Sequence, residues 1–485
     1  MSDKQPLSDE VRAGLRAIPA VNDLLAEWPC VKAVGEVGDA VVHAAIAAEL
    51  EAERAAIRTG AAARTKRELV LSIAERAHRS SLPSLRPAIN ATGVVVHTNL
   101  GRAPLAPEAV AAVGAVARGY STLEYSTETC SRGSRREHAA RLLRVLTGAE
   151  DALVVNNNAA AVWLVLAAHA AGREVIVSRG ELVEIGGSFR IPDIMAASGA
   201  RLVEVGATNR THLADYERAI TADTAMILKV HPSNYRIEGF HEEVPATELA
   251  ALARKHGLVF YEDQGSGALV SDEVLARGGE GSTPASIAAG LDIVSCSGDK
   301  LLGGAQAGII LGRRDLVAAC ASHPLMRALR PGKLALAALE ATLRLYLDGP
   351  EAAHARVPVL SMLSCPTVRL ERRAQKLAAL MERALADAGC AEAVALEVLP
   401  DSSTPGGGSL PTMELPTYCV SVAPREGEMG VDELKRALVQ EPDVPVVTRV
   451  AHDRLLFDVR TLIGEGDLDA VASTFSAVVE RRCRA

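Results

Sequence analysis

Between Glu150 and Leu311 the chain alternates short apolar runs with segments of helical pattern. Helices are expected at residues 159–171 and 245–256. Short, near-continuous apolar strands joined by helices are typical of a largely parallel sheet that is covered on both faces. The pattern therefore predicts an α/β fold whose ligands bind at the carboxyl ends of the strands. The expected strands are residues 151–156, 174–178, 201–206, 225–231, 258–263, 291–295 and 307–311.

Two regions of different pattern flank this segment. Residues 1 to about 85 repeat Ala, Leu and Glu with helical spacing, and Pro83 and Pro87 end that pattern. Towards the C-terminus, long helices are expected at 331–347 and 368–388. Strands are expected at 394–399 and 418–423, a Ser- and Gly-rich loop at 402–409, and two more helices near 432–439 and 468–481. The sequence thus predicts three domains: a helical domain at 1–85, a large α/β domain at 86–335, and a smaller α+β domain with its linking helices at 336–485.

Composition and charge narrow the class of protein. The formal net charge of −8 argues against a general nucleic-acid binder, although residues 54–86 hold eight Lys or Arg against two Asp or Glu. The eight Cys are scattered and form no cluster with His, so no metal site is expected. Scattered cysteines and an N-terminus without an apolar core predict a cytoplasmic protein.

Lys300 lies in a Ser- and Gly-rich turn directly after an expected buried strand. An amine in that position can form a Schiff base with an aldehyde cofactor such as pyridoxal phosphate. Ser297 can donate a hydrogen bond to a phosphate, and Gly303 and Gly304 allow close backbone approach. The alternative is an ordinary solvated lysine in a loop.

Asp263 ends a second expected strand, and Gln264–Gly267 follow it. A carboxylate there can pair with the protonated pyridine nitrogen of pyridoxal phosphate, which keeps the ring cationic and able to accept electrons. The alternative is an aspartate that caps the following turn.

A third strand end carries Asn156, Asn157 and Asn158 before an apolar helix. Free N–H groups at a helix start form a phosphate site, although ordinary helix capping is the alternative. The order of phosphate turn, Asp and Lys along the chain is that of fold-type I pyridoxal-phosphate enzymes. These strand ends together predict that fold, with the cofactor held by Asn157, Asn158, Ala159, Asp263, Ser297 and Lys300.

Long motifs also lie outside these strand ends. Ile89–Arg102 reads INATGVVVHTNLGR, and shorter motifs are Leu123–Tyr125, Arg132–Arg135, Val154–Ala161 and Gly186–Pro192. With the Lys300 segment, these motifs resemble those of the bacterial selenocysteine synthases, the L-seryl-tRNA(Sec) selenium transferases. The likeness runs from about residue 10 to the C-terminus. The chain departs from the family at Ser126–Cys130, where an acidic, Arg-containing stretch is expected, and at Ala305, where proline is usual.

The resemblance implies a pyridoxal-phosphate transferase that converts L-seryl-tRNA(Sec) to L-selenocysteinyl-tRNA(Sec) for selenoprotein biosynthesis. In the implied reaction the serine amine displaces Lys300 from the cofactor, and a base, plausibly Lys300 itself, removes the α-proton. Loss of the serine hydroxyl gives an aminoacrylyl-tRNA on the cofactor, to which selenium from selenophosphate adds. The resemblance also implies a homodecamer, a ring of dimers.

A small anionic selenium donor needs fixed cations. The resemblance places selenophosphate between Arg102, Arg327 and Arg330, with Arg135 as a further lining residue. Arginine suits this role because its planar fork binds tetrahedral oxyanions with two hydrogen bonds. The alternative for any one of these residues is an ordinary surface charge.

The resemblance also gives the N-terminal helical domain a role, which is to hold the tRNA by its shape and backbone. The alternative is a solvated basic helix face. His97 and Cys296 are interpreted as packing or supporting residues, and the segment from His231 to Tyr235 as a source of substrate contacts. The candidates for tRNA phosphate contacts are Arg54, Arg58, Arg64, Lys66, Arg67, Arg76 and Arg79.

Two other functions are compatible with parts of the sequence. A pyridoxal-phosphate lyase acting on a small amino acid or amino sugar would share Lys300 and Asp263 but would not need tRNA. The basic N-terminal segment and the pair Arg327 and Arg330 favour the transferase over this lyase. A non-catalytic nucleic-acid or nucleotide-binding module would have no use for the Lys300 and Asp263 pair.

Overall fold

The computed structural model of the 485-residue chain describes residues 8–185, 189–232, 234–271, 273–410, 412–425, 429–464 and 466–484. The chain divides into two compact units, of which the first ends at Pro87 and the second begins at Ala88. The further division predicted at residue 335 stays a prediction. None of the helices in the described ranges is long and apolar enough to cross a membrane.

The first unit is helical, as the sequence predicts. Its core is built from apolar side chains at helical spacing, among them Leu24, Ile46, Leu69 and Ile73, all of which are almost completely buried. The helices are α1 (Asp9–Ala17), α2 (Val21–Leu25), α3 (Trp28–Val37), α4 (Asp39–Arg58) and α5 (Lys66–Ser81).

Two buried carboxylates lie inside this unit. Glu49 and Glu53 on α4 are only 5% and 3% exposed. Arg64 holds both of them, with its Nε 2.6 Å from Glu53 Oε2 and its Nη2 3.0 Å from Glu49 Oε2. Arg76 adds a contact of 2.5 Å between its Nε and Glu49 Oε1. A buried carboxylate is tolerated only when it is paired, so Arg64 stabilises the unit itself.

Arg64→Ala should therefore loosen α4 and α5. Breaking a buried ion pair costs several kcal/mol, but Arg64 is partly exposed, so we expect a loss of about 2 kcal/mol of local stability. Hydrogen exchange on peptides from α4 and α5 in the full chain measures it. The control is Arg54→Ala, whose exposed pair with Glu51 spans 3.5 Å and should change exchange little. Equal protection in both variants would contradict this role of Arg64.

The second unit contains a seven-stranded sheet in the order β4-β12-β11-β10-β9-β5-β8. Neighbouring strands are parallel except at β12, which runs antiparallel to both β11 and β4. The largely parallel sheet is thus confirmed. The connection at 298–307 is too short for a crossover helix, so β12 returns antiparallel. The strands are β4 (Asp151–Val155), β5 (Glu174–Ser178), β8 (Arg201–Val205), β9 (Thr224–Val230), β10 (Val259–Gly265), β11 (Ile293–Ser297) and β12 (Gly308–Gly312).

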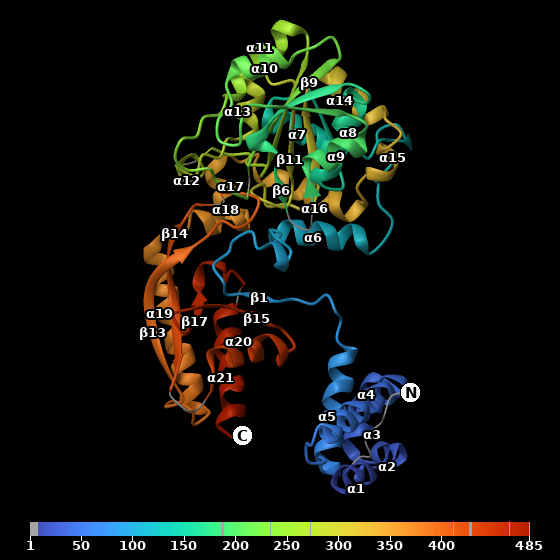
Figure 1. The fold of residues 1–485 in the computed structure, drawn as a ribbon, viewed down its shortest axis with the longest axis vertical. Coiled ribbons are helices and arrows are strands. Elements are labelled where there is room, and N and C mark those ends of the chain that lie inside the picture. Colours follow the sequence, from blue (N-terminus) through green and yellow to red (C-terminus); the bar gives the residue numbers. More distant parts are fainter. Residues whose placement is uncertain are drawn as a thin grey trace. The chain divides into compact units, whose positions relative to one another are not determined.

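Helices cover both faces of this sheet (Figure 1). On one face pack α8 (Asn158–His169), α9 (Ile191–Ser198) and α14 (Arg314–Ser322). The other face is covered by α7 (Glu137–Thr147), α10 (Leu213–Ala219), α11 (Ala246–His256), α13 (Thr283–Ala288) and α16 (Lys333–Leu345), and α6 (Pro107–Ala117) packs on α16. Shorter helices are α12 (Glu273–Arg277), α15 (Met326–Leu329), α17 (Pro350–Arg356) and α18 (Pro358–Leu363).

The C-terminal part forms a four-stranded antiparallel sheet in the order β13-β14-β17-β16. The strands predicted at 394–399 and 418–423 are parts of two ten-residue strands. The elements are α19 (Thr367–Asp387), β13 (Val394–Ser403), β14 (Leu415–Pro424), α20 (Val431–Gln440), β16 (Arg449–Ala451), β17 (Arg454–Asp458) and α21 (Asp467–Cys483). Two-residue strands pair as β1 (Ile89–Asn90) with β15 (Val446–Val447), β2 (Tyr125–Ser126) with β3 (Ser131–Arg132), and β6 (Glu184–Ile185) with β7 (Phe189–Arg190).

Candidate active site

Three strand ends of the central sheet meet around the side chain of Asp263. Asp263 lies near the end of β10, and the end of β11 lies beside it. Asn158, at the start of α8, donates from Nδ2 to Asp263 Oδ1 at 2.7 Å, and Ser295 Oγ donates to the same oxygen at 3.0 Å. The turn after β4 and the carboxylate of β10 are thus joined directly, as expected for strand ends at one edge of a sheet.

The Asp263 carboxylate lies in a setting that favours a positive partner. The residue is 6% exposed. Burial raises the pKa of Asp263 above its ordinary value, although hydrogen bonds from Asn158 and Ser295 and the nearby Lys300 oppose this rise. Asn158 Oδ1 is also buried and has no hydrogen-bond partner among the described residues. A cationic ligand group beside Asp263 would stabilise the charged carboxylate.

Lys300 is buried at the same edge of the sheet and is only 6% exposed. Burial and the positive charge of Arg102 lower its pKa, while Asp263, Asp299 and Glu280 oppose that shift. A lowered pKa increases the fraction of neutral amine at a given pH, and the neutral amine is the nucleophilic and basic form. The environment of Lys300 is therefore that of a reactive amine rather than of a solvated surface lysine.

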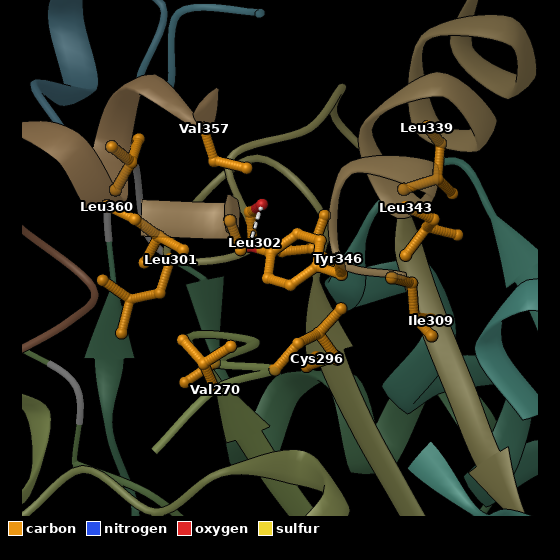
Figure 2. Packing of buried hydrophobic residues seen from close by; sticks show 14 of the residues in the cluster. Val270, Cys296, Leu301, Leu302, Ile309, Leu339, Leu343, Tyr346, Val357 and Leu360 are labelled. Atoms are coloured by element: carbon orange, nitrogen blue, oxygen red, sulfur yellow. Dashed lines mark hydrogen bonds between the residues drawn. The ribbon is translucent and has the colours of Figure 1, made fainter. Parts of the chain in front are cut away.

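The turn that carries Lys300 is anchored by apolar packing immediately after it. Leu301 and Leu302 are fully buried and extend into a cluster that includes Cys296. Figure 2 shows these side chains between the strands and the helices above them, with Tyr346 OH donating to Leu302 O at 2.7 Å. Cys296 is accordingly a packing residue, as the sequence suggested. Anchoring at this point fixes the backbone from which the Lys300 amine extends.

The turn between β4 and α8 serves partly as a helix cap. Asn157 Oδ1 accepts from Ala160 N–H at 2.9 Å, so this side chain caps α8. Ala159 lies in the first helical turn, whose N–H groups have no partner within the helix. Ser297 ends β11 and is 4% exposed. The Asn157 side chain therefore caps α8, and the cofactor contacts predicted for Asn157, Ala159 and Ser297 stay predictions.

A loop from the C-terminal part reaches Lys300, and sequence reasoning missed it. Gly408 has φ +89°, and a Cβ built there would lie 2.6 Å from Lys300 Nζ. Gly406 has φ +108°, and its Cβ would lie 2.5 Å from Val96 O. The three consecutive glycines 406–408 were interpreted only as a loop, although such a run is a signal for close backbone approach.

The four predicted anion-binding arginines fall into two groups. Arg102, with φ +64°, donates from Nη1 to Asp299 Oδ2 at 2.9 Å, next to Lys300 in the chain. Arg135, Arg327 and Arg330 instead line a cavity of about 530 Å³ that does not include Arg102. The backbone connects this second group to the phosphate turn, because Asn156 N–H donates to Leu329 O at 2.9 Å.

A carboxylate that sequence reasoning missed lies in the arginine cavity. Glu124 Oε1 is 2.6 Å from Arg135 Nη2 and 3.5 Å from Arg330 Nη1. These arginines lower the pKa of Glu124. The side chain of Arg327 makes no hydrogen bond or ion pair within the described ranges, so its charge is available to a ligand. Glu124 belongs to a motif that carried the family resemblance.

The basic residues of the first unit differ in their availability for RNA. Arg64 and Arg76 hold buried Glu49, and Lys66 Nζ pairs with Glu27 Oε1 at 2.6 Å. Arg54 and Arg79 have exposed partners in their own helices. Arg58 and Arg67 are exposed and have no ion-pair partner among the described residues. Of the motif residues, 186–188 and Ser233 lie outside the described residues.

Comparison with known proteins identifies the family. The family model described as L-seryl-tRNA selenium transferase matches residues 88–463, which contain every strand end described above. The chain belongs to this family. Of the curated relatives, the L-seryl-tRNA(Sec) selenium transferase of Moorella thermoacetica is 51% identical over 94% of this chain and 96% of its own length. The transferase of Solidesulfovibrio magneticus is 48% identical over 95% and 97% of the two chains.

One solved structure shares the fold at lower identity. The chain in the structure of D-glucosaminate-6-phosphate ammonia-lyase shares 21% sequence identity with this chain. The match has a TM-score of 0.56 and covers 82% of this chain and 97% of that chain. This likeness concerns the fold alone. The architecture is the fold-type I arrangement predicted from the strand ends, and family and fold together imply pyridoxal phosphate as the cofactor. Buried Asp263 and the glycine-bounded space around Lys300 fit such a group.

Gly408→Ala should disturb the space around Lys300. The new methyl group would overlap the position of Nζ, and alanine would be strained at φ +89°. We expect the cofactor absorbance near 420 nm to fall severalfold at limiting pyridoxal phosphate. Gly389→Ala is the control, since it has a similar positive φ of +73° but open space around it. Full cofactor loading in Gly408→Ala would contradict the close approach.

Proposed function

We propose that this protein converts L-seryl-tRNA(Sec) to L-selenocysteinyl-tRNA(Sec) with selenophosphate as the selenium donor. The observation that carries the proposal is the convergence of Asn158, Asp263 and buried Lys300 at one sheet edge. Relatives that match nearly the whole chain bear the name of this activity.

Pyridoxal phosphate, when bound, supplies an aldehyde that reacts with amines and a ring that takes up electrons from the substrate. The Asp263 carboxylate would pair with the ring nitrogen, and Asn158 holds that carboxylate in place. Lys300 would hold the aldehyde and would accept the α-proton of the serine residue. Ser297 and the N–H group of Ala159 would hold the phosphate.

The arginines present the selenium donor. Arg327 has no partner among the residues that the structure describes, and Arg135 and Arg330 share the carboxylate of Glu124 within one cavity. A tetrahedral dianion can be held by several such forks at once. Arg102, which pairs with Asp299 beside Lys300, is the fourth arginine assigned to selenophosphate in this proposal. The homodecamer implied by the resemblance remains part of this proposal.

Replacing Arg327 and Arg330 together by Ala should impair selenium transfer without impairing the binding of cofactor or tRNA. We expect normal cofactor content and tRNA binding, because the strand-end residues are untouched, and a fall in selenium transfer of at least about 100-fold. Transfer of radioactive selenium to tRNA measures the effect. Arg344→Ala is the control, because within the described part of the chain that side chain pairs only with Glu340, on the surface of α16. Full transfer by the double variant would refute the assigned roles.

Binding of tRNA distinguishes the transferase from a lyase of the same fold. We expect gel-shift assays to show tighter binding of selenocysteine tRNA than of serine tRNA. Replacing Arg58 and Arg67 by Gln should weaken both complexes and reduce the slope of log K against log salt by about 1.5 to 2, because two phosphate contacts are lost. Equal affinity for the two tRNAs in the unaltered protein would count against the proposed function.

A further inference from the structure

His231 follows β9 directly and lies at the strand end next to Asp263. Its backbone N–H donates to Asp263 O at 2.9 Å, which continues the parallel pairing of β9 with β10. The imidazole therefore starts from the same sheet edge as the predicted cofactor residues. Sequence reasoning placed His231 on this rim without a defined role.

A buried carboxylate holds the imidazole. His231 Nε2 lies 3.3 Å from Glu280 Oε2, and the Glu280 side chain is 2% exposed. The other oxygen, Oε1, accepts a hydrogen bond from Ser266 Oγ. Ser266 O in turn accepts from Leu301 N–H at 3.0 Å. This chain of contacts joins His231 to the turn that carries Lys300, so the two side chains belong to one assembly.

The imidazole also borders open space. His231 lines a cavity of about 680 Å³ together with Tyr235, Arg236 and Thr208. Its side chain is 31% exposed, whereas its carboxylate partner is almost completely buried. The arrangement of a buried acid, an oriented imidazole and an accessible cavity is one in which a proton can be passed to a bound molecule.

Dehydration of a seryl residue needs such a proton donor, since hydroxide is a poor leaving group. We propose that His231, oriented by Glu280, is the catalytic acid that protonates the departing β-hydroxyl of the seryl group, an inference that rests on the proposed function. Lys300 takes the α-proton, and the electron pair of the Cα–H bond forms the Cα=Cβ bond. The Cβ–O bond breaks, its oxygen takes the proton from His231, and water leaves. His231 is left neutral and Lys300 protonated.

The surroundings of His231 favour its protonated form. Burial alone would lower the pKa of His231, but Glu280, with smaller contributions from Glu262 and Glu243, raises it above the ordinary value. Positive side chains that line the same cavity include Arg210, Arg236 and Arg277. A raised pKa keeps the proton on His231 towards higher pH, so the dehydration step loses its acid as the pH rises through that pKa.

The first test follows two bonds of the same substrate. When the enzyme is incubated with seryl-tRNA(Sec) in heavy water, deuterium uptake measures removal of the α-proton. An added thiol that traps the dehydrated product measures loss of the hydroxyl. We expect His231→Gln to retain α-exchange within about threefold while dehydration falls about 100-fold. His212→Gln is the matched control, because His212 pairs with Glu242 in an exposed ion pair. Unchanged dehydration, or an equal fall of both signals, would overturn the assignment.

The second test does not use turnover. Diethyl pyrocarbonate reacts with histidine only when the imidazole is neutral. Peptide mass spectrometry measures the rate of this reaction at His231 as a function of pH. Glu280→Gln should shift this profile to lower pH, in the cofactor-free and the loaded enzyme alike. An unshifted profile would overturn the pairing. Absence of α-exchange in the unaltered enzyme would instead contradict the proposed function, and with it this inference.

Discussion

The buried carboxylate of Asp263 is the constraint on which the site depends. It has almost no access to water, and it is held by hydrogen bonds from a helix start and from the neighbouring strand. Burial of a carboxylate is costly unless a positive group compensates it. Burial of Asp263 at this edge of the sheet therefore costs free energy, which a cationic cofactor ring would offset. Lys300 and Asn158 lie in positions from which they could hold such a ring.

Much of this edge could be predicted from sequence. Buried parallel strands are near-continuous apolar runs, so their ends are visible, and the polar residues that follow them must lie at one edge. Asp263 and Lys300 were found in this way. The antiparallel direction of β12 was not predicted, because an apolar run does not show in which direction a strand runs. The short connection before β12 does favour an antiparallel strand.

Contacts between distant segments account for what could not be predicted. Gly408 is more than a hundred residues from Lys300 and comes to it through the packing of the C-terminal part. Glu124 lies only 11 residues before Arg135, but it also contacts Arg330, which is 206 residues away in the sequence. The sequence predicts Arg64 as a phosphate contact, but it does not reveal that Arg64 pairs with the buried carboxylate of Glu53. Pairing of charges depends on three-dimensional packing, and a helical pattern alone does not reveal it.

Lys300 is proposed to act on a serine residue carried on tRNA. The most direct measurement incubates the purified protein, loaded with pyridoxal phosphate, with seryl-tRNA(Sec) and selenophosphate, and then identifies the amino acid released from the tRNA. We expect selenocysteine with the unaltered enzyme and only serine with Lys300→Ala. Recovery of unchanged serine from the unaltered enzyme, or equal conversion by the variant, would contradict this proposal.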